Sequence, residues 1–370
     1  MKSQQSLYVT PPESLIGGSL TPSPTSKKTT GVVSRLLQII INYKDGCGAR
    51  PEPWTVYILN KKKYKDLLRL LQRDEFLWGF VQDKLSYDYF SSTRRFILRM
   101  HSFEHEFVKC RVVEEIKRQL SSIASGQNHS AEFAKQVITE ASVSLKFPDS
   151  PLDKHDPDER FGHYLAQWPA VILEVSFSQK KKDLSRLADA YILGSDGDIR
   201  VLIGLDIEYR GTKKATLSIW RPRSVTNDAG EEELVAMQTV TDEIIRDENG
   251  TPNDSAEAGL HLQLEDFGPE GMAQPPGSLS DPIHIPAAAL CSYIEHAEKR
   301  STMVTEGKGI RGTPKTWVRK RRRKSTPTEE LDERREKKFR VSEERKMGQA
   351  EKDDSSYKAS ASEAESSPGS

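Results

Sequence analysis

A strand–helix–strand pattern in the middle of the chain constrains the fold more than any other feature. Residues 170–177 are an apolar run typical of a buried strand, 181–193 show helical spacing, and 201–205 form a second apolar strand. Two strands joined through a helix by short connections predict a βαβ unit, in which the strands run parallel. We therefore expect a mixed α/β domain built around this unit.

The flanking segments add helices and further strands. Upstream, the patterns predict strands at 54–59 and 95–100 and helices at 64–83 and 103–124. The expected apolar side of the first helix includes Phe76, and that of the second consists of Cys110, Val113, Ile116, Leu120 and Ile123. Downstream, antiparallel strands are expected near 215–221, 233–240 and 260–266, followed by a helix at 286–299. The prediction is a mixed sheet flanked by helices, with extra antiparallel strands.

Both ends of the chain differ in composition from its centre. Residues 1–49 are expected to form a disordered tail, because their first thirty are rich in Ser, Thr and Pro with few apolar anchors. Residues 301–370 are expected to be a second, charged tail. It contains an unbroken run of six cations at 319–324. One folded domain over 50–300 remains.

Composition limits the classes of function. Lys plus Arg and Asp plus Glu both count 55, so the net charge of zero gives no global case for a nucleic-acid binder. The three cysteines are far apart, which argues against a disulfide framework or a cysteine zinc site. No membrane span and no secretory signal are expected. The run at 319–324 favours a nuclear protein that meets an import receptor, with the cytoplasm as the other location.

Two carboxylates mark the candidate site. Glu174 lies inside an apolar strand, and Asp158 follows a Pro at a turn shortly before it. Ionised carboxylates are rarely buried unless they are paired or hold a metal. On the strand, Val171, Leu173 and Val175 should point one way and Ile172, Glu174 and Ser176 the other. The alternative is a surface turn plus an edge-strand carboxylate paired with a lysine of 180–182; the apolar surroundings of Glu174 favour the functional interpretation.

The helix at 103–124 begins with polar residues. Its expected inward face carries His105, Glu106 and Lys109 at the first turn and is apolar afterwards. Such a switch occurs where a helix reaches a functional site, but also where a helix end emerges into water, and for this turn alone the second interpretation is favoured. His101 and His105 have zinc-ligand spacing. Without evident further ligands, a pair of histidines at a helix end is the favoured interpretation.

Several of these motifs resemble a known nuclease superfamily. The segments Met100–Glu106, Pro157–Asp158 and Leu173–Gln179 resemble restriction endonuclease-like proteins of the Uma type, which belong to the PD-(D/E)XK superfamily. The stretch from about 155 to 222 is more closely similar to a group of fungal proteins of unknown activity. The resemblance covers roughly 95–210 and implies a restriction-endonuclease-like core.

The resemblance implies roles for particular residues. Asp158 and Glu174 would be ligands of Mg²⁺ or Mn²⁺, with Glu106 as a looser match. The superfamily pattern has a lysine two residues after the glutamate, where this chain has Ser176. Candidates for the replacement cation near the reacting phosphate are Lys180, Lys182, Arg186 and, from the helix, Lys109. The sequence does not choose among them.

Nucleic acid is the implied partner. Arg200, Arg210, Lys213 and Lys214 are candidates for contacts to its backbone, although solvated loop charges explain them equally well. The first expectation is a metal-dependent nuclease acting on DNA or RNA, or a nuclease-derived protein. The second is a catalytically inactive nuclease fold that binds nucleic acid or protein. A third is that the charged C-terminal stretch recruits a partner and carries the function.

Overall fold

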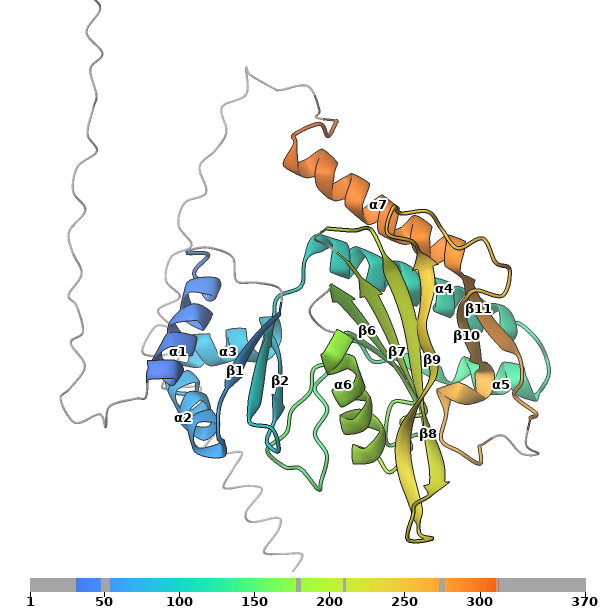
Figure 1. Ribbon diagram of the computed structural model, residues 1–370, viewed down its shortest axis with the longest axis horizontal. Coiled ribbons are helices and arrows are strands. Elements are labelled where there is room, and N and C mark those ends of the chain that lie inside the picture. The colour runs from blue at the N-terminus through green and yellow to red at the C-terminus, as the bar shows by residue number, and fades with distance from the viewer. Residues whose placement is uncertain are drawn as a thin grey trace, which may run out of the picture. The chain divides into compact units, whose positions relative to one another are not determined.

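The computed structural model describes residues 31–47, 54–177, 181–208, 211–272, 277–310 and 312. All of the elements described below belong to one compact unit, which ends at Lys308 (Figure 1). The cationic run at 319–324 lies outside the described residues.

A mixed sheet forms the centre of this unit, and six strands in the order β4-β5-β6-β7-β8-β9 are assigned to it among the described residues. The strands are β4 (Val137–Thr139), β5 (Glu159–His163), β6 (Val171–Phe177), β7 (Val201–Ile207), β8 (Ala215–Thr226) and β9 (Glu232–Arg246). Strands β6 and β7 are parallel, and α6 (Lys181–Gly194) connects them, which confirms the predicted βαβ unit. The other neighbouring strands pair antiparallel.

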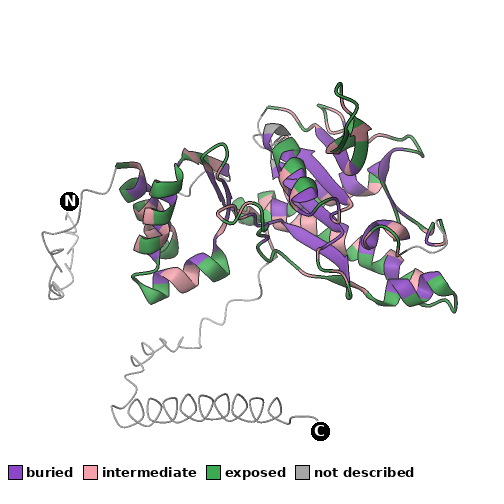
Figure 2. Ribbon diagram, turned by 90° about the horizontal axis from the view of Figure 1, so that it is seen from below, coloured by how far each residue is buried: buried purple, intermediate pink, exposed green. Residues whose placement is uncertain are grey.

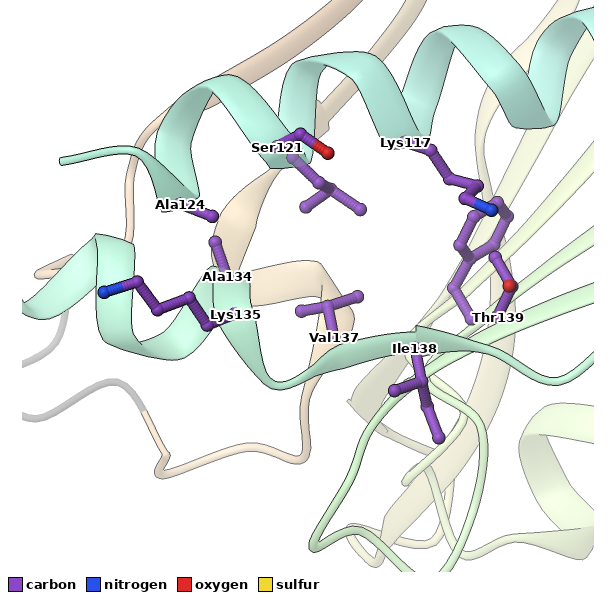
Figure 3. Close-up of a pocket in the computed structure, with 10 residues that line it drawn as sticks. Lys117, Ser121, Ala124, Ala134, Lys135, Val137, Ile138 and Thr139 are labelled. Carbon is purple, nitrogen blue, oxygen red and sulfur yellow. The ribbon is translucent and has the colours of Figure 1, made fainter.

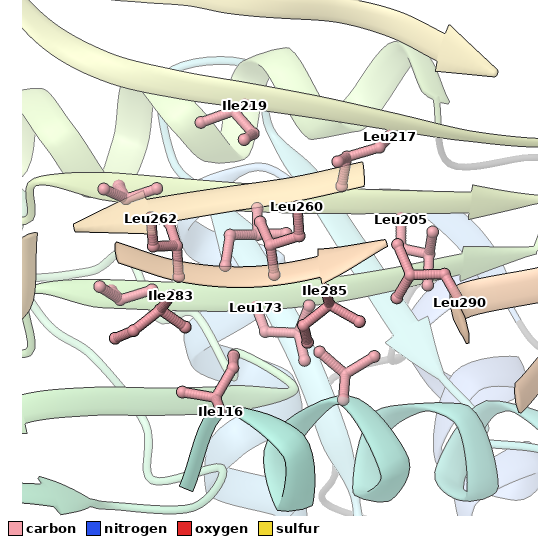
Figure 4. Close-up of a cluster of buried hydrophobic side chains, with 14 of the residues drawn as sticks. Ile116, Leu173, Leu205, Leu217, Ile219, Leu260, Leu262, Ile283, Ile285 and Leu290 are labelled. Atoms are coloured by element: carbon pink, nitrogen blue, oxygen red, sulfur yellow. The ribbon is translucent and has the colours of Figure 1, made fainter. Parts of the chain in front are cut away.

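The two faces of the sheet pack against different elements. On one face lie α4 (Phe103–Ala124), α5 (His129–Lys135), α7 (Ala287–Thr305) and the ribbon of β10 (Gly259–Gln263) and β11 (Pro282–Pro286), with a 3₁₀ turn at Leu264–Phe267. Figure 4 shows the apolar side chains that meet there, including Leu173 and Leu205. Helix α6 covers the opposite face, where Ile172 packs against Leu184 and Leu187. The predicted alternation of residues along β6 is thus confirmed.

The N-terminal elements form a second core. This region contains α1 (Gly31–Lys44), β1 (Trp54–Ile58), α2 (Lys61–Leu71), α3 (Glu75–Lys84), β2 (Ser86–Phe90) and β3 (Arg95–Arg99). The strands form an antiparallel sheet in the order β1-β3-β2. Apolar side chains from its helices and strands share one cluster, in which Tyr64 of α2 stacks on Tyr89 of β2 with ring centroids 3.7 Å apart.

Three expectations about the N-terminal half are wrong. Helix α1 lies within the range assigned to a disordered tail, and its Leu36 and Ile40 are buried in the second core. The single helix expected at 64–83 is two helices, because Asp74 caps the start of α3 by accepting a hydrogen bond from Leu77 N. Phe76, expected on the apolar side, is 87% exposed.

A further correction, beyond these three, concerns α4, whose bounds agree with the prediction but whose buried face does not. The structure buries Val108 and Val112 with Ile116 and Leu120, while Cys110 is exposed. The buried stripe therefore runs along a rotated face. His105 belongs to this face and is only 3% exposed, so the expectation that the first turn emerges into water is wrong for this residue, while Phe103 is exposed and Glu106 partly exposed.

Figure 2 shows that buried residues dominate the central strands, whereas the helices are exposed along one side. Among the described residues, we find no helix that is both long enough and apolar enough to cross a membrane.

Candidate functional site: an arginine between two buried carboxylates

The two predicted carboxylates meet a guanidinium group from the N-terminal sheet. Asp158 immediately precedes β5, Glu174 lies in the middle of β6, and Arg99 is the last residue of β3. The side chains of all three are 0% exposed. The site therefore lies where the N-terminal sheet meets the central sheet, near the start of α4 (Figure 1).

Arg99 bridges the pair. Its Nη2 donates to Glu174 Oε2 at 2.6 Å and also contacts Asp158 Oδ1. Its Nη1 donates to the backbone carbonyl oxygen of Asp156 at 2.6 Å. The guanidinium also lies over the ring of Trp54, 5.5 Å from its centroid. A single fixed cation thus pairs with both carboxylates and binds the loop that precedes β5.

The other carboxylate oxygens also have protein donors. Asp158 Oδ2 accepts from the backbone N–H of Val175 at 2.7 Å and contacts His105 Nε2 at 2.9 Å. Glu174 Oε1 accepts from the hydroxyl of Tyr191 at 2.9 Å. A Mg²⁺ ion requires near-octahedral oxygen ligands with room for several waters. With the Arg99 guanidinium in place, the pair of Asp158 and Glu174 does not fit such an ion.

A third carboxylate, Asp88 of β2, adds negative charge to the cluster. Its side chain is 0% exposed and lies 3.4 Å from Nη1 of Arg99. Burial opposes ionisation of Asp88, but Arg99 and His155 outweigh it, so the pKa of this carboxyl is lowered. Burial likewise disfavours the charged form of Arg99. The carboxylates of Asp158, Glu174 and Asp88 prevail and hold its pKa well above the ordinary value.

Tyr191 reaches Glu174 because α6 packs closely on the sheet. Glu174 is paired in register with Gly204 of β7. A Cβ added at Gly204 would lie 2.9 Å from a methyl of Leu184 and 3.0 Å from the ring of Trp220, so only glycine fits there without a shift. Burial, reinforced by the charge of Glu174, raises the pKa of Tyr191 well above its ordinary value. The hydroxyl is therefore a fixed neutral donor.

An accessible rim borders this buried cluster at the start of α4. Ser102 caps the helix by accepting from His105 N at 3.2 Å. Glu106, with 41% of its side chain exposed, lies 2.9 Å from His101 Nδ1, and its other oxygen is 2.7 Å from Lys109 Nζ. The rim is thus a polar network that solvent reaches, attached to the buried cluster through Asp158 and His105.

The pKa values at the rim reflect this pairing. Burial alone would raise the pKa of Glu106. Hydrogen bonds with His101, His105 and Lys109 lower it by more, so the net shift is downward. Burial lowers the pKa of Lys109, but Glu106 outweighs it and the net direction is up. For His101 burial dominates and lowers the pKa. Glu106 and Lys109 are therefore both charged at neutral pH.

The predicted site residues are only partly brought together. Asp158, Glu106 and Lys109 are connected through His105 and His101. Glu174 joins Asp158 through Arg99. Ser176, in place of the superfamily lysine, is buried and donates its hydroxyl hydrogen to Asp206 of β7. Lys180 lies outside the described residues, and so does the side chain of Lys182. Arg186 contacts Asp183 at 2.8 Å instead.

The candidate nucleic-acid contacts do not join this network through any described contact. Arg200 pairs with Glu270 at 2.9 Å. Lys213 is exposed and Lys214 half-buried in the segment before β8. Arg210 lies outside the described residues. Their role in binding nucleic acid stays a prediction.

A groove of about 410 Å³ lies elsewhere along α4, between that helix and β4 (Figure 3). Lys117 and Ser121 of α4, Lys135 of α5 and Thr139 of β4 supply its polar groups. None of the predicted site residues lines it.

The largest difference from the predicted site is that the structure adds Arg99, Asp88 and Tyr191 to it.

Comparison with known proteins does not assign the chain to a family. No family model matches it, and no curated protein shows significant similarity to it. The geometry of the site therefore carries the functional argument.

Proposed function

We propose that this protein is a nuclease-derived domain that binds nucleic acid and does not hydrolyse it through Asp158 and Glu174. One observation carries the proposal: the Arg99 guanidinium bridges the two carboxylates, and the three side chains are completely buried. In a nuclease of the PD-(D/E)XK type, this is the place of a hydrated divalent cation. Here the Arg99 side chain supplies the positive charge, and neither carboxylate is exposed to substrate.

The order of elements supports a restriction-endonuclease-like origin. After α4 and the short α5, three antiparallel strands follow, and α6 then leads to a parallel strand, as in β4, β5, β6, α6 and β7. Loss of a hydrolytic site leaves binding as the retained property. The cationic run at 319–324 would add sequence-independent attraction to phosphates and direct the protein to the nucleus.

A metal-dependent nuclease remains the second candidate, favoured by the charge of the site. Asp88, Asp158 and Glu174 face a single buried arginine. The rim beside them offers the imidazole of His101, a carboxylate at Glu106 and the ammonium group of Lys109. If Arg99 moved aside on substrate binding, Mg²⁺ or Mn²⁺ would have two carboxylate ligands, and Lys109 would be the cation nearest to a phosphate at the rim.

Binding and cleavage assays on the full chain separate the two candidates. Labelled single- and double-stranded DNA and RNA would be incubated with Mg²⁺, Mn²⁺ or a chelator, with wild type, Asp158→Asn and Glu174→Gln compared. We expect binding that persists in chelator and no metal-dependent cutting. Metal-dependent cutting that disappears in both variants would establish the nuclease instead. Absence of binding to all four nucleic acids would contradict both.

A further inference from the structure

Two histidines and a glutamate at the start of α4 bring three metal-ligating atoms together. His101, His105 and Glu106 each offer one such atom, and these atoms lie within 4.8 Å of one another. The rings of His101 and His105 are stacked, with their centroids 4.3 Å apart. Both turn Nδ1 toward the same oxygen, Oε1 of Glu106, at 2.9 Å and 3.2 Å.

The opposite nitrogen of each ring lies against a second carboxylate. Nε2 of His105 is 2.9 Å from Asp158 Oδ2, and Nε2 of His101 is 3.4 Å from Asp158 Oδ1. A neutral imidazole has one N–H, so each ring can donate to only one of its two carboxylates. When the donors point at Asp158, two nitrogen lone pairs face the oxygen of Glu106. That arrangement is repulsive unless a cation lies between them.

We propose that His101, His105 and Glu106 form a transition-metal site, with Zn²⁺ as the best-suited ion. The two Nδ1 atoms and Glu106 Oε1 would be the ligands, and Asp158 would orient the His105 ring from behind. Carboxylates that accept the second N–H of a metal-bound histidine are a general feature of such sites. Ligand atoms about 2.0 Å from a tetrahedral Zn²⁺ lie about 3.3 Å from one another. The two nitrogen-to-oxygen distances, 2.9 Å and 3.2 Å, are close to that value.

The chemistry of the ligands separates this site from the predicted magnesium site. Two nitrogens and one oxygen suit Zn²⁺ and neighbouring transition metals, whereas Mg²⁺ prefers oxygen alone. Lys109 holds the other oxygen of Glu106 at 2.7 Å and leaves Oε1 as a single ligand atom. Three protein ligands leave a fourth position for water or a ligand, and the partial exposure of His101 and Glu106 gives access to it. The inference does not depend on nucleic-acid binding.

Cobalt is a suitable probe, because Co²⁺ in a tetrahedral site absorbs visible light. Untagged full-length protein, freed of metal with a chelator, would be titrated with Co²⁺ and then with Zn²⁺ as a competitor. We expect a site occupied by one Co²⁺ per chain and displaced by Zn²⁺. His101→Asn and Glu106→Gln should each weaken Co²⁺ binding at least about 10-fold. Glu114→Gln, an exposed position on the same helix, should leave the affinity unchanged.

Two further results decide the location of the metal. X-ray absorption on the wild type should show scattering from two imidazoles and requires no variant that must fold. Glu174→Gln, checked for folding by circular dichroism, should leave the site occupied. The proposal is overturned if folded wild type binds no Co²⁺, if the spectrum lacks imidazole ligands, or if both rim variants bind Co²⁺ as the wild type does. Loss of binding only in Glu174→Gln would also overturn it, by placing the ion at the carboxylate pair.

Discussion

The buried cluster around Arg99 and the rim of α4 share the carboxylate of Asp158, but its partners on the two sides differ in kind. Inside, Asp158 meets a fixed guanidinium and the backbone N–H of Val175. Outside, the same carboxylate meets the ring nitrogens of His105 and His101, whose other nitrogens face a partly exposed glutamate. Internal compensation of charge makes the first region structural. In the second, ligand atoms converge and solvent has access, so we expect metal binding at the rim.

The largest expected effect comes from removing the buried cation. Arg99→Met leaves three buried carboxylates without their guanidinium and should lower the free energy of unfolding by about 3–5 kcal/mol. Denaturant titration at neutral pH measures this. Arg69→Met is the matched control, since Arg69 is 69% exposed in its side chain, and it should change stability by less than about 0.5 kcal/mol. Equal effects of the two substitutions would show that the cluster is not structural.

The decrease in the free energy of unfolding at acid pH should depend on Asp88. Because its pKa in the folded protein lies below the ordinary 3.8, ionised Asp88 stabilises the fold. This contribution is fully present above pH 3.8 and is lost as the pH falls through the lower, folded-state pKa. We expect wild type and Asp88→Asn to differ most near neutral pH and to converge at low pH. A constant difference between them across the acid range would contradict the assignment, and Asp66→Asn on α2, where the carboxylate is partly exposed, serves as the control.

A smaller effect is expected from the tyrosine that holds Glu174. Tyr191→Phe removes a hydroxyl that donates to Glu174 at 2.9 Å and leaves a buried acceptor with one donor fewer. The expected loss of stability is about 1–3 kcal/mol, since the ring still fills its place between α6 and the sheet. Thermal and denaturant unfolding both measure it. Tyr43→Phe, a tyrosine on α1 outside this cluster, provides the comparison.

The smallest effect on stability should come from the rim. Lys109→Met removes an ammonium 2.7 Å from Glu106, whose side chain is 41% exposed. A pair that is solvated to this degree contributes less than about 1 kcal/mol. The same unfolding experiment tests this expectation. A loss as large as that of Arg99→Met would remove the distinction between a structural interior and a chemical rim.

The sequence predicted the βαβ unit that carries Glu174, but not the Arg99 guanidinium that pairs with it. The βαβ pattern and the orientation of Glu174 follow from local periodicity, which the chain keeps across residues 170–205. Asp158 and Glu174 were identified because a carboxylate in or near an apolar strand is costly. The same reasoning applied to Arg99, at the end of the apolar strand Phe96–Leu98, would have identified the cation. Asp88, between Tyr87 and Tyr89, carries the same signal.

Contacts between elements that are distant in the sequence could not be predicted. Arg99 and Glu174 come from strands in different sheets, and no local spacing encodes that contact. The buried face of α4 was predicted with Cys110 and not Val108, because its apolar residues fit two neighbouring stripes about equally well. His105 lies on the inward side in both arrangements, but periodicity alone does not show whether the first turn is buried or emerges into water. Tertiary packing therefore determined which residues of the first turn join the site.

A crystal structure of the wild type grown with Mn²⁺, with anomalous scattering recorded, shows whether an arginine or a metal ion lies between the buried carboxylates. We expect the Arg99 guanidinium between Asp158 and Glu174, no anomalous peak between those carboxylates, and any peak in this region at His101, His105 and Glu106. A peak coordinated by Asp158 and Glu174, with Arg99 displaced, would show that the buried pair is a metal site and restore the metal-dependent nuclease.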